Sequence, residues 1–163
     1  MVNNPPEYLH FKNHCNSSGV FNPLPFLSDE VIYRCYSGNK THPINEFFSE
    51  VRFEGGISVN RSMYSKNPTD VLWRNEHIPS DDNILSCNYL PRNGIVIYSV
   101  YNKLIQANPP QNILLDIKNT WIKCNVSHCD IIINTEVEKI TSPLKREVRL
   151  FLASLFKELS LAA

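Results

Sequence analysis

The pattern of hydrophobic and polar residues predicts a protein made mainly of short β-strands. Apolar and aromatic residues alternate with polar ones, or run together, in short stretches that end at Gly, Pro, Asn or Ser. The clearest stretch is the β-branched and aromatic segment Val31–Tyr36. The other strand candidates are 56–61, 84–90, 95–101, 113–117, 121–125 and 129–133.

The segment 55–64, with the sequence GGISVNRSMY, is the most informative of these candidates. Two glycines open it, apolar residues alternate along it, and the polar residues Asn60, Arg61 and Ser62 stand at its exit. Polar groups at the end of a rigid strand often border a pocket. We therefore expect a central strand that places Arg61 at a pocket rim, where it binds an anion.

Two internal segments have helical signals. Residues 44–51 follow a proline and repeat apolar residues at the i, i+3, i+4 and i+7 spacing of one helix face. A second, short helix is predicted to begin at Asn67 as its cap, with Pro68 in its first turn and Asp70 near its positive end.

The clearest helix is predicted over residues 142–160, with Ser142 as its cap and Pro143 as its first residue. A continuous apolar stripe along it predicts a buried face. The stripe consists of Leu144, Val148, Phe151, Leu152, Leu155 and Leu159. The opposite face is basic, but two interleaved glutamates favour a solvated face over a phosphate-binding one.

The segments between these elements are predicted to be irregular. The proline-rich and asparagine-rich residues 1–28 form an arm, because proline disrupts both helices and strands. Residues 75–83 form a polar loop, and 91–94 connect the strands 84–90 and 95–101 as a hairpin. The arm residues expected to pack on the body are Phe11, Phe21 and Phe26.

These elements predict an α+β protein that forms a single domain over residues 1–163. We expect a mostly antiparallel, twisted sheet of about six strands, short helices, and a C-terminal amphipathic helix packed on one face of the sheet. A chain of 163 residues is long enough to bury a core in this way.

Composition and charge exclude several classes of protein. Lys plus Arg and Asp plus Glu both number 16, so the net charge is zero and nonspecific binding of nucleic acid is not expected. No apolar run approaches the roughly 20 residues that span a bilayer. The first residues lack the apolar core of a signal peptide, so we expect a cytoplasmic protein without a membrane anchor. The five irregularly spaced cysteines are then expected to be reduced thiols.

Three residue types in chain order suggest chemistry on a nucleotide. Arg34 is suited to clamp a diphosphate, Ser58 or Ser62 to support the strand that holds a ribose, and the Glu-Val-Glu of 136–138 to stabilise a cationic sugar carbon. This order and spacing resemble the arginine–serine–glutamate pattern of ADP-ribosyltransferases, although Ser-Val-Asn at 58–60 replaces the usual Ser-Thr-Ser. The resemblance implies NAD as the substrate. The alternative is that Arg34 and the glutamates are ordinary surface charges.

His128 is a further candidate for acid–base chemistry or phosphate contact, because histidine changes its charge near neutral pH. Strand alternation places Asp130 on the same face, where it could orient the ring, and Cys129 on the opposite face in the core. An ordinary surface pair is the alternative. The predicted catalytic residues are His128, Glu136 and Glu138, and the predicted substrate-binding residues are Arg34, Ser58 and Arg61.

Two clusters of histidine and cysteine have the residue types of a zinc site. They are His10, His14 and Cys15 in the arm, and Cys124, His128 and Cys129 near the last strand. Their spacing differs from that of C-x-x-C knuckles, and free cysteine is usually buried. We therefore predict buried cysteines and surface histidines rather than a metal site.

A longer pattern over residues 31–133 resembles a group of small uncharacterised bacterial proteins. It comprises the strand 31–36, the strand Gly-Ile-Ser-Val-Asn-Arg at 56–61 with its following Thr-Asp-Val-Leu helix, the strand 94–100, and Ser-His-Cys-Asp-Ile at 127–131. Arg61 and His128 match the group's Ser-Val-x-Arg and His-small-x-Ile strands, with cysteine in place of the usual alanine after the histidine. The resemblance implies an arrangement of strands and no mechanism.

Two classes of function follow. The first is a small bacterial-type enzyme with a nucleotide- or phosphate-binding site, either ADP-ribosyltransferase-like or nucleic-acid-processing, in a toxin or defence system. The second is a non-catalytic interaction module, like an immunity protein or antitoxin, whose exposed aromatic residues bind a protein partner. The aromatic residues in question are Tyr89, Tyr98, Tyr101 and Trp121.

Overall fold

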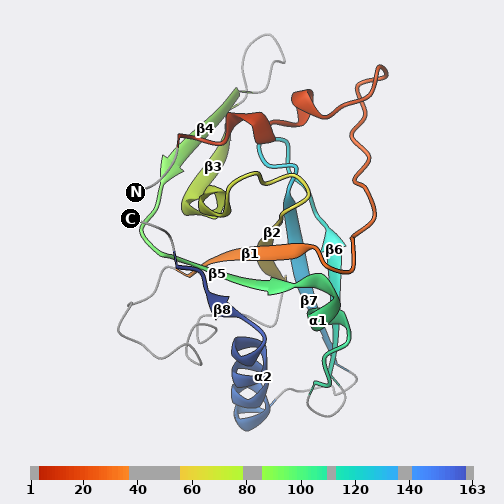
Figure 1. Ribbon diagram of the computed structural model, residues 1–163, viewed down its shortest axis with the longest axis vertical. Coiled ribbons are helices and arrows are strands. Elements are labelled where there is room, and N and C mark those ends of the chain that lie inside the picture. Colours follow the sequence, from red (N-terminus) through yellow and green to blue (C-terminus); the bar gives the residue numbers. More distant parts are fainter. Residues whose placement is uncertain (1–3, 37–55, 79–85, 110–112, 136–140, 161–163) are drawn as a thin grey trace.

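Six strands form one antiparallel sheet that crosses the molecule (Figure 1). The computed structural model describes residues 4–36, 56–78, 86–109, 113–135 and 141–160. The strand order is β6-β7-β2-β1-β5-β8, with antiparallel neighbours throughout. The strands are β1 (Val31–Tyr36), β2 (Ile57–Arg61), β5 (Ile95–Val100), β6 (Ile113–Asn119), β7 (His128–Thr135) and β8 (Lys157–Glu158). The predicted α+β fold with a mostly antiparallel sheet is confirmed.

Helix α2 (Ser142–Ser154) covers one face of this sheet (Figure 1). Its residues Val148, Leu152 and Ala153 are buried in the same cluster as the strand residues of the core. Burial of a side chain such as Leu152 stabilises the fold by about 1.5–3 kcal/mol. The strand residues of this core are Ile32, Tyr36, Ile57, Val59, Ile95, Ile97, Ile113, Ile117, Cys129 and Ile131.

Both ends of α2 differ from the prediction. The cap is Thr141 rather than the following serine, because the Thr141 hydroxyl accepts a hydrogen bond from the Leu144 N–H at 3.4 Å. The helix ends at Ser154, several residues earlier than predicted. Beyond it, β8 pairs with β5, and the Leu159 N–H donates to the Val96 carbonyl at 2.8 Å. Pairing with the sheet therefore overrides the helical periodicity of the last residues.

The opposite face of the sheet carries a 3₁₀ helix and a second, two-stranded sheet (Figure 1). The 3₁₀ helix η4 (Pro68–Leu72) begins as predicted, with Asn67 as its cap and the Asp70 carboxylate accepting from the Asn67 N–H at 3.3 Å. The second sheet pairs β3 (Trp73–Ile78) with β4 (Ser86–Pro91) and is called the β3–β4 ribbon below. The residues packed between η4 and the main sheet are Cys35, Val71, Leu72 and Val96.

The β3–β4 ribbon corrects two predictions. The segment 75–83, predicted as a loop, contains most of β3. Its polar and charged residues suggested a loop, but the strand is stabilised by pairing along its length with β4. The predicted hairpin between 84–90 and 95–101 is wrong, since β4 pairs with β3 while β5 pairs with β1 and β8. The connection from β4 to β5 is instead anchored to η4, where the Arg92 N–H donates to the Leu72 carbonyl at 2.9 Å.

The predicted strand 121–125 is also wrong, because residues 122–127 form a turn. An isolated bridge joins Ile122 to Asn125, and the Asn125 side chain accepts hydrogen bonds from the N–H and the hydroxyl of Ser127. Hydrogen bonding of an asparagine side chain to nearby backbone favours turns over strands.

The other helical prediction, for residues 44–51, lies outside the described residues. Helix α1 (Tyr101–Ile105) is a short segment directly after β5. Among the described helices, none has both the length and the apolar composition required to cross a membrane.

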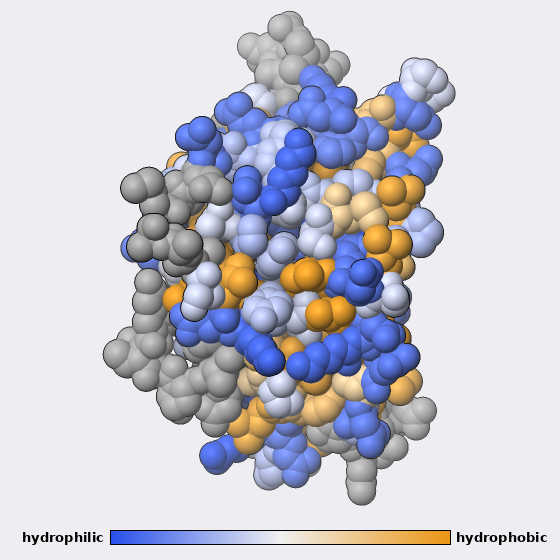
Figure 2. All heavy atoms as spheres, viewed as in Figure 1, coloured by the Kyte–Doolittle hydropathy of each residue, from blue (hydrophilic) through white to orange (hydrophobic). Residues whose placement is uncertain are grey.

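The described part of the N-terminal arm, residues 4–28, is mostly irregular and contains two single-turn 3₁₀ helices. These are η1 (Glu7–Leu9) and η2 (Phe11–Asn13). Figure 2 shows hydrophobic residues along the right edge of the molecule, where the arm runs in Figure 1. The most exposed apolar residues of the arm are Val20, Leu24 and Leu27, at 48%, 53% and 52% exposure.

The phenylalanines of the arm pack on the body of the protein as predicted. Phe11 and Phe21 lie against Trp121, with ring centroids 6.4 and 5.2 Å from that of the tryptophan. Phe26 stacks on Tyr101 with the centroids 4.6 Å apart. These contacts attach an irregular segment to the sheet without regular hydrogen bonding.

Candidate functional site

A pocket of about 180 Å³ lies between the main sheet and the β3–β4 ribbon, and it is called the sheet–ribbon pocket below. Strands β1, β2 and β7 line it, together with β3, η4 and the 122–127 turn. The lining residues are Arg34, Cys35, Ser58, Val59, Asn60, Val71, Trp73, Arg74, Asn75, Arg92, Ile122, Asn125 and His128.

Three of the predicted site residues, Arg34, Ser58 and His128, line this pocket together. The antiparallel order β7-β2-β1 brings them close, although 70 positions separate Ser58 from His128 in the chain. The predicted glutamates Glu136 and Glu138 lie outside the described residues. The convergence of an arginine, a serine and a histidine makes this pocket the candidate site.

Arg34 of β1 is hydrogen-bonded to β2 at the pocket. β1 and β2 are paired at only two positions and separate beyond Tyr33. The Arg34 guanidinium crosses this gap and donates a hydrogen bond to the Ser58 carbonyl at 3.0 Å. Arg34 therefore supplies positive charge to the pocket from a position fixed by the adjacent strand.

The His128 ring is held by Thr120 rather than by the predicted partner Asp130. His128 Nδ1 lies 3.0 Å from the Thr120 carbonyl oxygen and 3.1 Å from its hydroxyl oxygen. A carbonyl oxygen can only accept, so this contact favours the proton on Nδ1 of the neutral ring. Nε2 is then the nitrogen that can accept a proton at the pocket.

The ribbon side of the pocket contributes hydrogen-bond donors. The indole N–H of Trp73 is buried and has no hydrogen-bond partner among the described residues. Arg74 pairs with Glu76 at 3.2 Å, while 62% of its side chain stays exposed. Arg92 donates to the Val71 carbonyl from Nε at 2.9 Å and from a terminal nitrogen at 2.7 Å. Those two bonds fix the Arg92 guanidinium against η4.

A buried polar network holds the amide groups of the pocket in place. The Asn60 side-chain oxygen accepts from Asn125 at 2.9 Å, and the Asn60 amide lies 3.5 Å from the Ser65 hydroxyl. Ser65 donates to Asp70 at 3.0 Å, and the Tyr8 hydroxyl donates to the same carboxylate. Burial and the neighbouring carboxylate raise the pKa of Tyr8 well above its ordinary value. These hydrogen bonds therefore fix the orientation of the Asn60 and Asn125 side-chain amides at the pocket.

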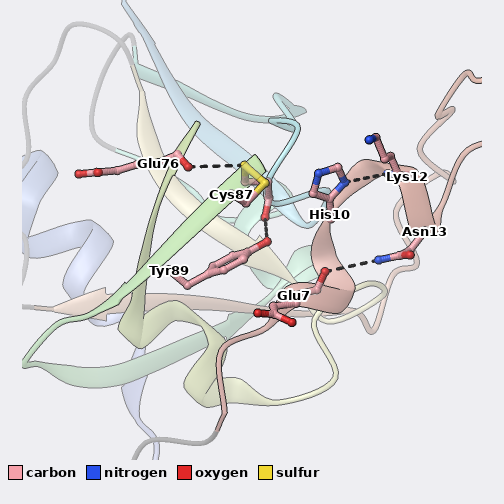
Figure 3. Close-up of a disulfide and its surroundings, with 8 residues drawn as sticks. Glu7, His10, Lys12, Asn13, Glu76, Cys87 and Tyr89 are labelled. Atoms are coloured by element: carbon pink, nitrogen blue, oxygen red, sulfur yellow. Dashed lines mark hydrogen bonds between the residues drawn. A yellow bond between two sulfur atoms is a disulfide. The ribbon is translucent and has the colours of Figure 1, made fainter. Parts of the chain in front are cut away.

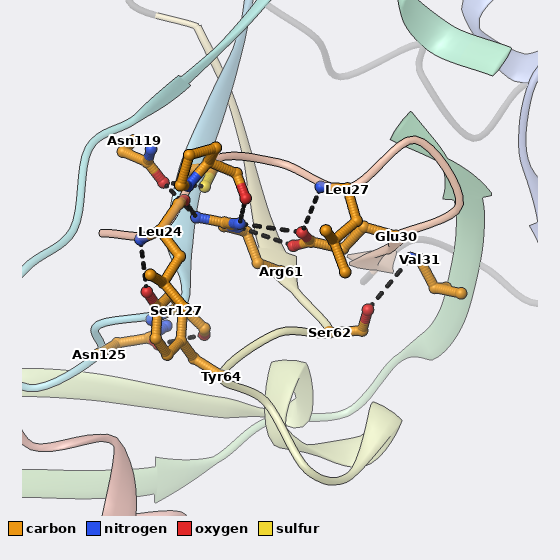
Figure 4. Close-up of polar contacts among 12 residues, drawn as sticks. Leu24, Leu27, Glu30, Val31, Arg61, Ser62, Tyr64, Asn119, Asn125 and Ser127 are labelled. Carbon is orange, nitrogen blue, oxygen red and sulfur yellow. Dashed lines mark hydrogen bonds and ion pairs between the residues drawn. The ribbon is translucent and has the colours of Figure 1, made fainter. Parts of the chain in front are cut away.

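Arg61 does not line the pocket and is completely buried inside the protein (Figure 4). Its Nε and one terminal nitrogen donate to the two Glu30 carboxylate oxygens at 2.7 and 2.9 Å. The remaining bonds run to the Leu24 and Pro25 carbonyls at 2.6 and 3.1 Å and to the Asn119 side chain at 3.1 Å. The five N–H groups of a guanidinium are thus matched by five protein acceptors.

These contacts correct the prediction that Arg61 binds an anion at a pocket rim. The Phe26 ring lies 4.1 Å from the guanidinium carbon and excludes solvent from one side. Burial alone lowers the pKa of the guanidinium, but hydrogen bonds to Glu30 and its charge outweigh this and raise the pKa. Ser62 is structural as well, because its hydroxyl accepts from the Val31 N–H at 3.1 Å. Arg61 and Ser62 therefore organise the fold, whereas Asn60 of the same segment lines the sheet–ribbon pocket.

Cys87 and Cys124 form a disulfide, which corrects the prediction that all five cysteines are reduced (Figure 3). The two residues are 37 positions apart, and their Cα atoms come within 5.7 Å because β4 packs beside the 122–127 turn. The Tyr89 hydroxyl donates to the Cys124 carbonyl at 2.8 Å in the same region. Cys15, Cys35 and Cys129 are not part of a disulfide.

The two histidine–cysteine clusters do not form one site in the described part of the chain. Cys124 is committed to the disulfide, and Cys129 is buried in the core, where burial raises its thiol pKa to about 12. His14 Nε2 lies 2.8 Å from the Tyr8 carbonyl. Among the described residues, no group of three or more His, Cys, Asp and Glu side chains is arranged to hold a metal ion.

The four aromatic residues predicted to form an exposed interface are partly buried instead. Tyr89 bonds to the Cys124 carbonyl, and Tyr101 and Trp121 pack against phenylalanines of the arm. Tyr98 lies in β5, opposite Tyr33 of β1. Part of their hydrophobic area is therefore packed within the fold.

Sequence reasoning misses Trp73, Arg74 and Arg92 as site residues. It predicts a short helix, begun at Asn67, that carries Trp73 and ends near Arg74, and a hairpin turn that contains Arg92. The signal that could have found the first two is the alternation in 73–76, where Trp73 and Asn75 are partly buried and the charged residues Arg74 and Glu76 are exposed. Alternation of this kind is typical of a strand with one buried face.

Comparisons with models of known protein families, with curated proteins and with solved structures find no significant match. The resemblances to ADP-ribosyltransferases and to small bacterial proteins therefore stay predictions.

Proposed function

We propose that the sheet–ribbon pocket binds a small anion, with the phosphate group of a nucleotide or related molecule as the preferred ligand. The observation that carries this proposal is the composition of the lining. Three arginines and one histidine line the pocket, and no Asp or Glu does so among the described residues. Arginine is the side chain best suited to bind phosphate through paired, charge-assisted hydrogen bonds.

The Trp73 indole N–H supports the same interpretation. A buried donor without a partner costs about 1–3 kcal/mol, and a ligand oxygen removes that cost by accepting the hydrogen bond. Trp73 lines the pocket and is such a donor among the described residues. A ligand rich in acceptor oxygens therefore fits the pocket better than a cation or an apolar molecule.

The Glu76 carboxylate, which competes with a ligand for Arg74, is bound only weakly. Glu76 pairs with Arg74, but the two side chains are 49% and 62% exposed. Exposed ion pairs of this kind are worth at most about 1 kcal/mol. An incoming phosphate, with more acceptor oxygens and a higher charge, can replace Glu76 as the partner of Arg74.

The size of the pocket limits what it encloses. Its volume of about 180 Å³ is below the roughly 300–1,000 Å³ of pockets that enclose a whole small molecule. A phosphate group fits inside, while the base and sugar of a nucleotide lie outside. NAD, the substrate in the transferase interpretation, would therefore be bound through its diphosphate.

His128 is the candidate acid–base residue of the proposed site. Among the described lining residues it is the side chain that ordinarily changes charge near neutral pH. Its Nδ1 contact with Thr120 directs Nε2 to act as acceptor or, when protonated, donor toward a bound phosphate ester. We propose a cytoplasmic setting for this activity, as the sequence predicts.

The test is a titration with inorganic phosphate, pyrophosphate, ADP and NAD, followed by calorimetry at low ionic strength. We expect binding of the phosphates, and at least about a threefold loss of affinity in Arg74→Gln, which removes one charge near the anion. Arg146→Gln is the matched control, because Arg146 is exposed on α2, away from the pocket. No binding of any ligand, or an equal loss in both variants, contradicts the proposal.

A further inference from the structure

The Cys87–Cys124 disulfide connects two parts of the wall of the sheet–ribbon pocket. Cys124 belongs to the 122–127 turn, which contributes Asn125 to the lining and leads directly into His128. Cys87 belongs to β4, which is hydrogen-bonded along its length to β3, and β3 contributes Trp73 to the lining. The disulfide therefore holds β3 in position through β4.

In the described part of the chain, other polar links hold the ribbon at both of its ends. At one end, Arg92 is hydrogen-bonded to the Val71 and Leu72 carbonyls of η4. At the Cys87 end, the Tyr89 hydroxyl bond to the Cys124 carbonyl accompanies the disulfide. An isolated two-stranded sheet is marginally stable in water. The position of β3 thus depends on these two anchors.

A second cavity, of about 310 Å³, gives access to the disulfide (Figure 3). Its lining residues are Glu7, His10, Lys12, Asn13, Cys87 and Tyr89. Cys87 is half-buried and lines this cavity, whereas Cys124 is completely buried. An incoming thiolate can therefore reach the sulfur of Cys87 and not that of Cys124.

We propose that this disulfide is a thiol-exchange site, entered through the second cavity, whose redox state sets the affinity of the sheet–ribbon pocket for its anion. The inference rests on the proposed function of that pocket. It also fits a cytoplasmic setting, because disulfides in the cytoplasm are usually transient, catalytic or redox-sensing.

The exchange proceeds in two steps with a dithiol as reductant. A thiolate of the dithiol attacks Cys87 Sγ, the Cys87–Cys124 bond breaks, and Cys124 leaves as a thiolate that takes up a proton. The second thiolate of the same reductant molecule then attacks the reductant sulfur that is bonded to Cys87. The mixed disulfide breaks, and Cys87 leaves as a thiolate that takes up a proton. Two electrons pass to the protein, and the reductant leaves as its cyclic disulfide.

Reduction removes the stronger of the two links at the Cys87 end of the ribbon. The core between the main sheet and α2 contains neither cysteine of the disulfide, so it stays folded. β3 then spends less time in the position that completes the pocket. If that position is occupied about one-tenth of the time, the apparent affinity falls about tenfold.

The experiment compares oxidised and dithiothreitol-reduced wild-type protein, each titrated with pyrophosphate. Mass spectrometry confirms the redox state, and amide hydrogen exchange of β1 and β5 confirms that the main sheet is intact. We expect binding about tenfold weaker after reduction, and faster amide exchange confined to β3, β4 and the 122–127 turn. Trapping with glutathione should place the mixed disulfide on Cys87.

The double variant Cys87→Ser/Cys124→Ser is the control, because it keeps the other three cysteines. It should bind like the reduced wild type and should not respond to dithiothreitol. Equal binding by the oxidised and reduced wild type overturns the inference and leaves the proposed function standing. Absence of binding by the oxidised protein overturns both. A response of the double variant to reductant, or a disulfide that resists native reduction, also overturns the inference.

Discussion

The buried centre around Arg61 and the sheet–ribbon pocket, which is lined by three arginines, differ in where their hydrogen-bond donors find acceptors. Arg61 has no exposed surface, and all five of its N–H groups meet acceptors of the protein itself. In the sheet–ribbon pocket, Arg74 keeps most of its side chain in solvent, and the Trp73 N–H lacks an acceptor among the described residues. The first region is complete without a ligand, whereas the second has donors in excess.

The comparison teaches that an arginine near a strand end is not in itself a sign of anion binding. A buried guanidinium is tolerated only when acceptors surround it, and those acceptors leave no donor for a ligand. The distinction depends on whether a carboxylate such as Glu30 lies nearby in space. Measurements of stability and of phosphate binding should therefore separate the two regions.

The largest effect is expected from Glu30→Ala. This change leaves Arg61 as a buried charge without its counterion, and it should lower the free energy of unfolding by about 3–5 kcal/mol. Urea unfolding followed by circular dichroism measures the loss. Glu147→Ala, at an exposed position on α2, is the control and should change stability by no more than about 0.5 kcal/mol. Similar losses in both variants would contradict the structural role of the Arg61–Glu30 pair.

A second effect concerns alkaline pH. Burial raises the pKa of the Cys129 thiol and of the Tyr89 hydroxyl to about 12, above their ordinary values of 9.0 and 10.0. Above pH 9 the unfolded chain loses these protons first, so stability falls as pH rises toward 12. Through the Cys129 thiol alone, the free energy of unfolding should be lower at pH 11 than at pH 8 by on the order of 2 kcal/mol.

Unfolding free energies measured between pH 8 and pH 11 test this effect. Cys129→Ala should have a lower stability at pH 8 and a shallower decline above pH 9, because it lacks one of the groups whose pKa is raised by folding. An unchanged slope in this variant would show that Cys129 is not responsible.

Trp73→Phe should affect binding more than stability. The change removes a buried donor that has no partner in the described protein, so the free energy of unfolding should fall by less than about 1.5 kcal/mol. Phosphate affinity should fall several-fold, measured by calorimetry. Trp121→Phe, in the aromatic cluster of the arm, should leave the affinity unchanged. Unchanged binding by Trp73→Phe would remove the indole from the site.

The smallest change in stability is expected from His128→Asn, because an asparagine amide can replace Nδ1–H as donor to the Thr120 carbonyl. The free energy of unfolding should change by less than about 1 kcal/mol. Phosphate affinity, measured by calorimetry, should fall several-fold in the variant, because asparagine lacks the second ring nitrogen that can contact the anion. His10→Asn is the control, since asparagine can still cap η2, and it should leave the affinity unchanged. Equal affinity of wild type and His128→Asn would exclude His128 from contact with the anion.

Much of the main sheet could be predicted from local pattern. Val31–Tyr36 is a strand with the predicted bounds because its β-branched and aromatic residues favour extended backbone in any context. The buried strand 57–61 and the Pro68 helix start also carry their own signals. The sequence predicts a site of Arg34, Ser58, Arg61, His128, Glu136 and Glu138. Of these, Arg34, Ser58 and His128 line one pocket, whereas Arg61 is buried elsewhere and the two glutamates lie outside the described residues.

The remaining features depend on contacts that are distant in sequence. β3 is stabilised by its partner β4, and the local sequence WRNEHI has no strong strand preference. The role of Arg61 is set by Glu30, Leu24 and Asn119, none of which is near it in the chain. The disulfide likewise depends on the approach of β4 to the 122–127 turn. Such features require the three-dimensional arrangement before they can be recognised.

The Arg61 centre also has a consequence for how the chain folds. Its acceptors come from the N-terminal arm and from the end of β6, up to 58 positions away. A partly folded chain that has formed β2 but lacks either segment would bury a cation without enough acceptors, which is costly. Intermediates of that kind are disfavoured, and arm and sheet are expected to fold and unfold together in one cooperative transition.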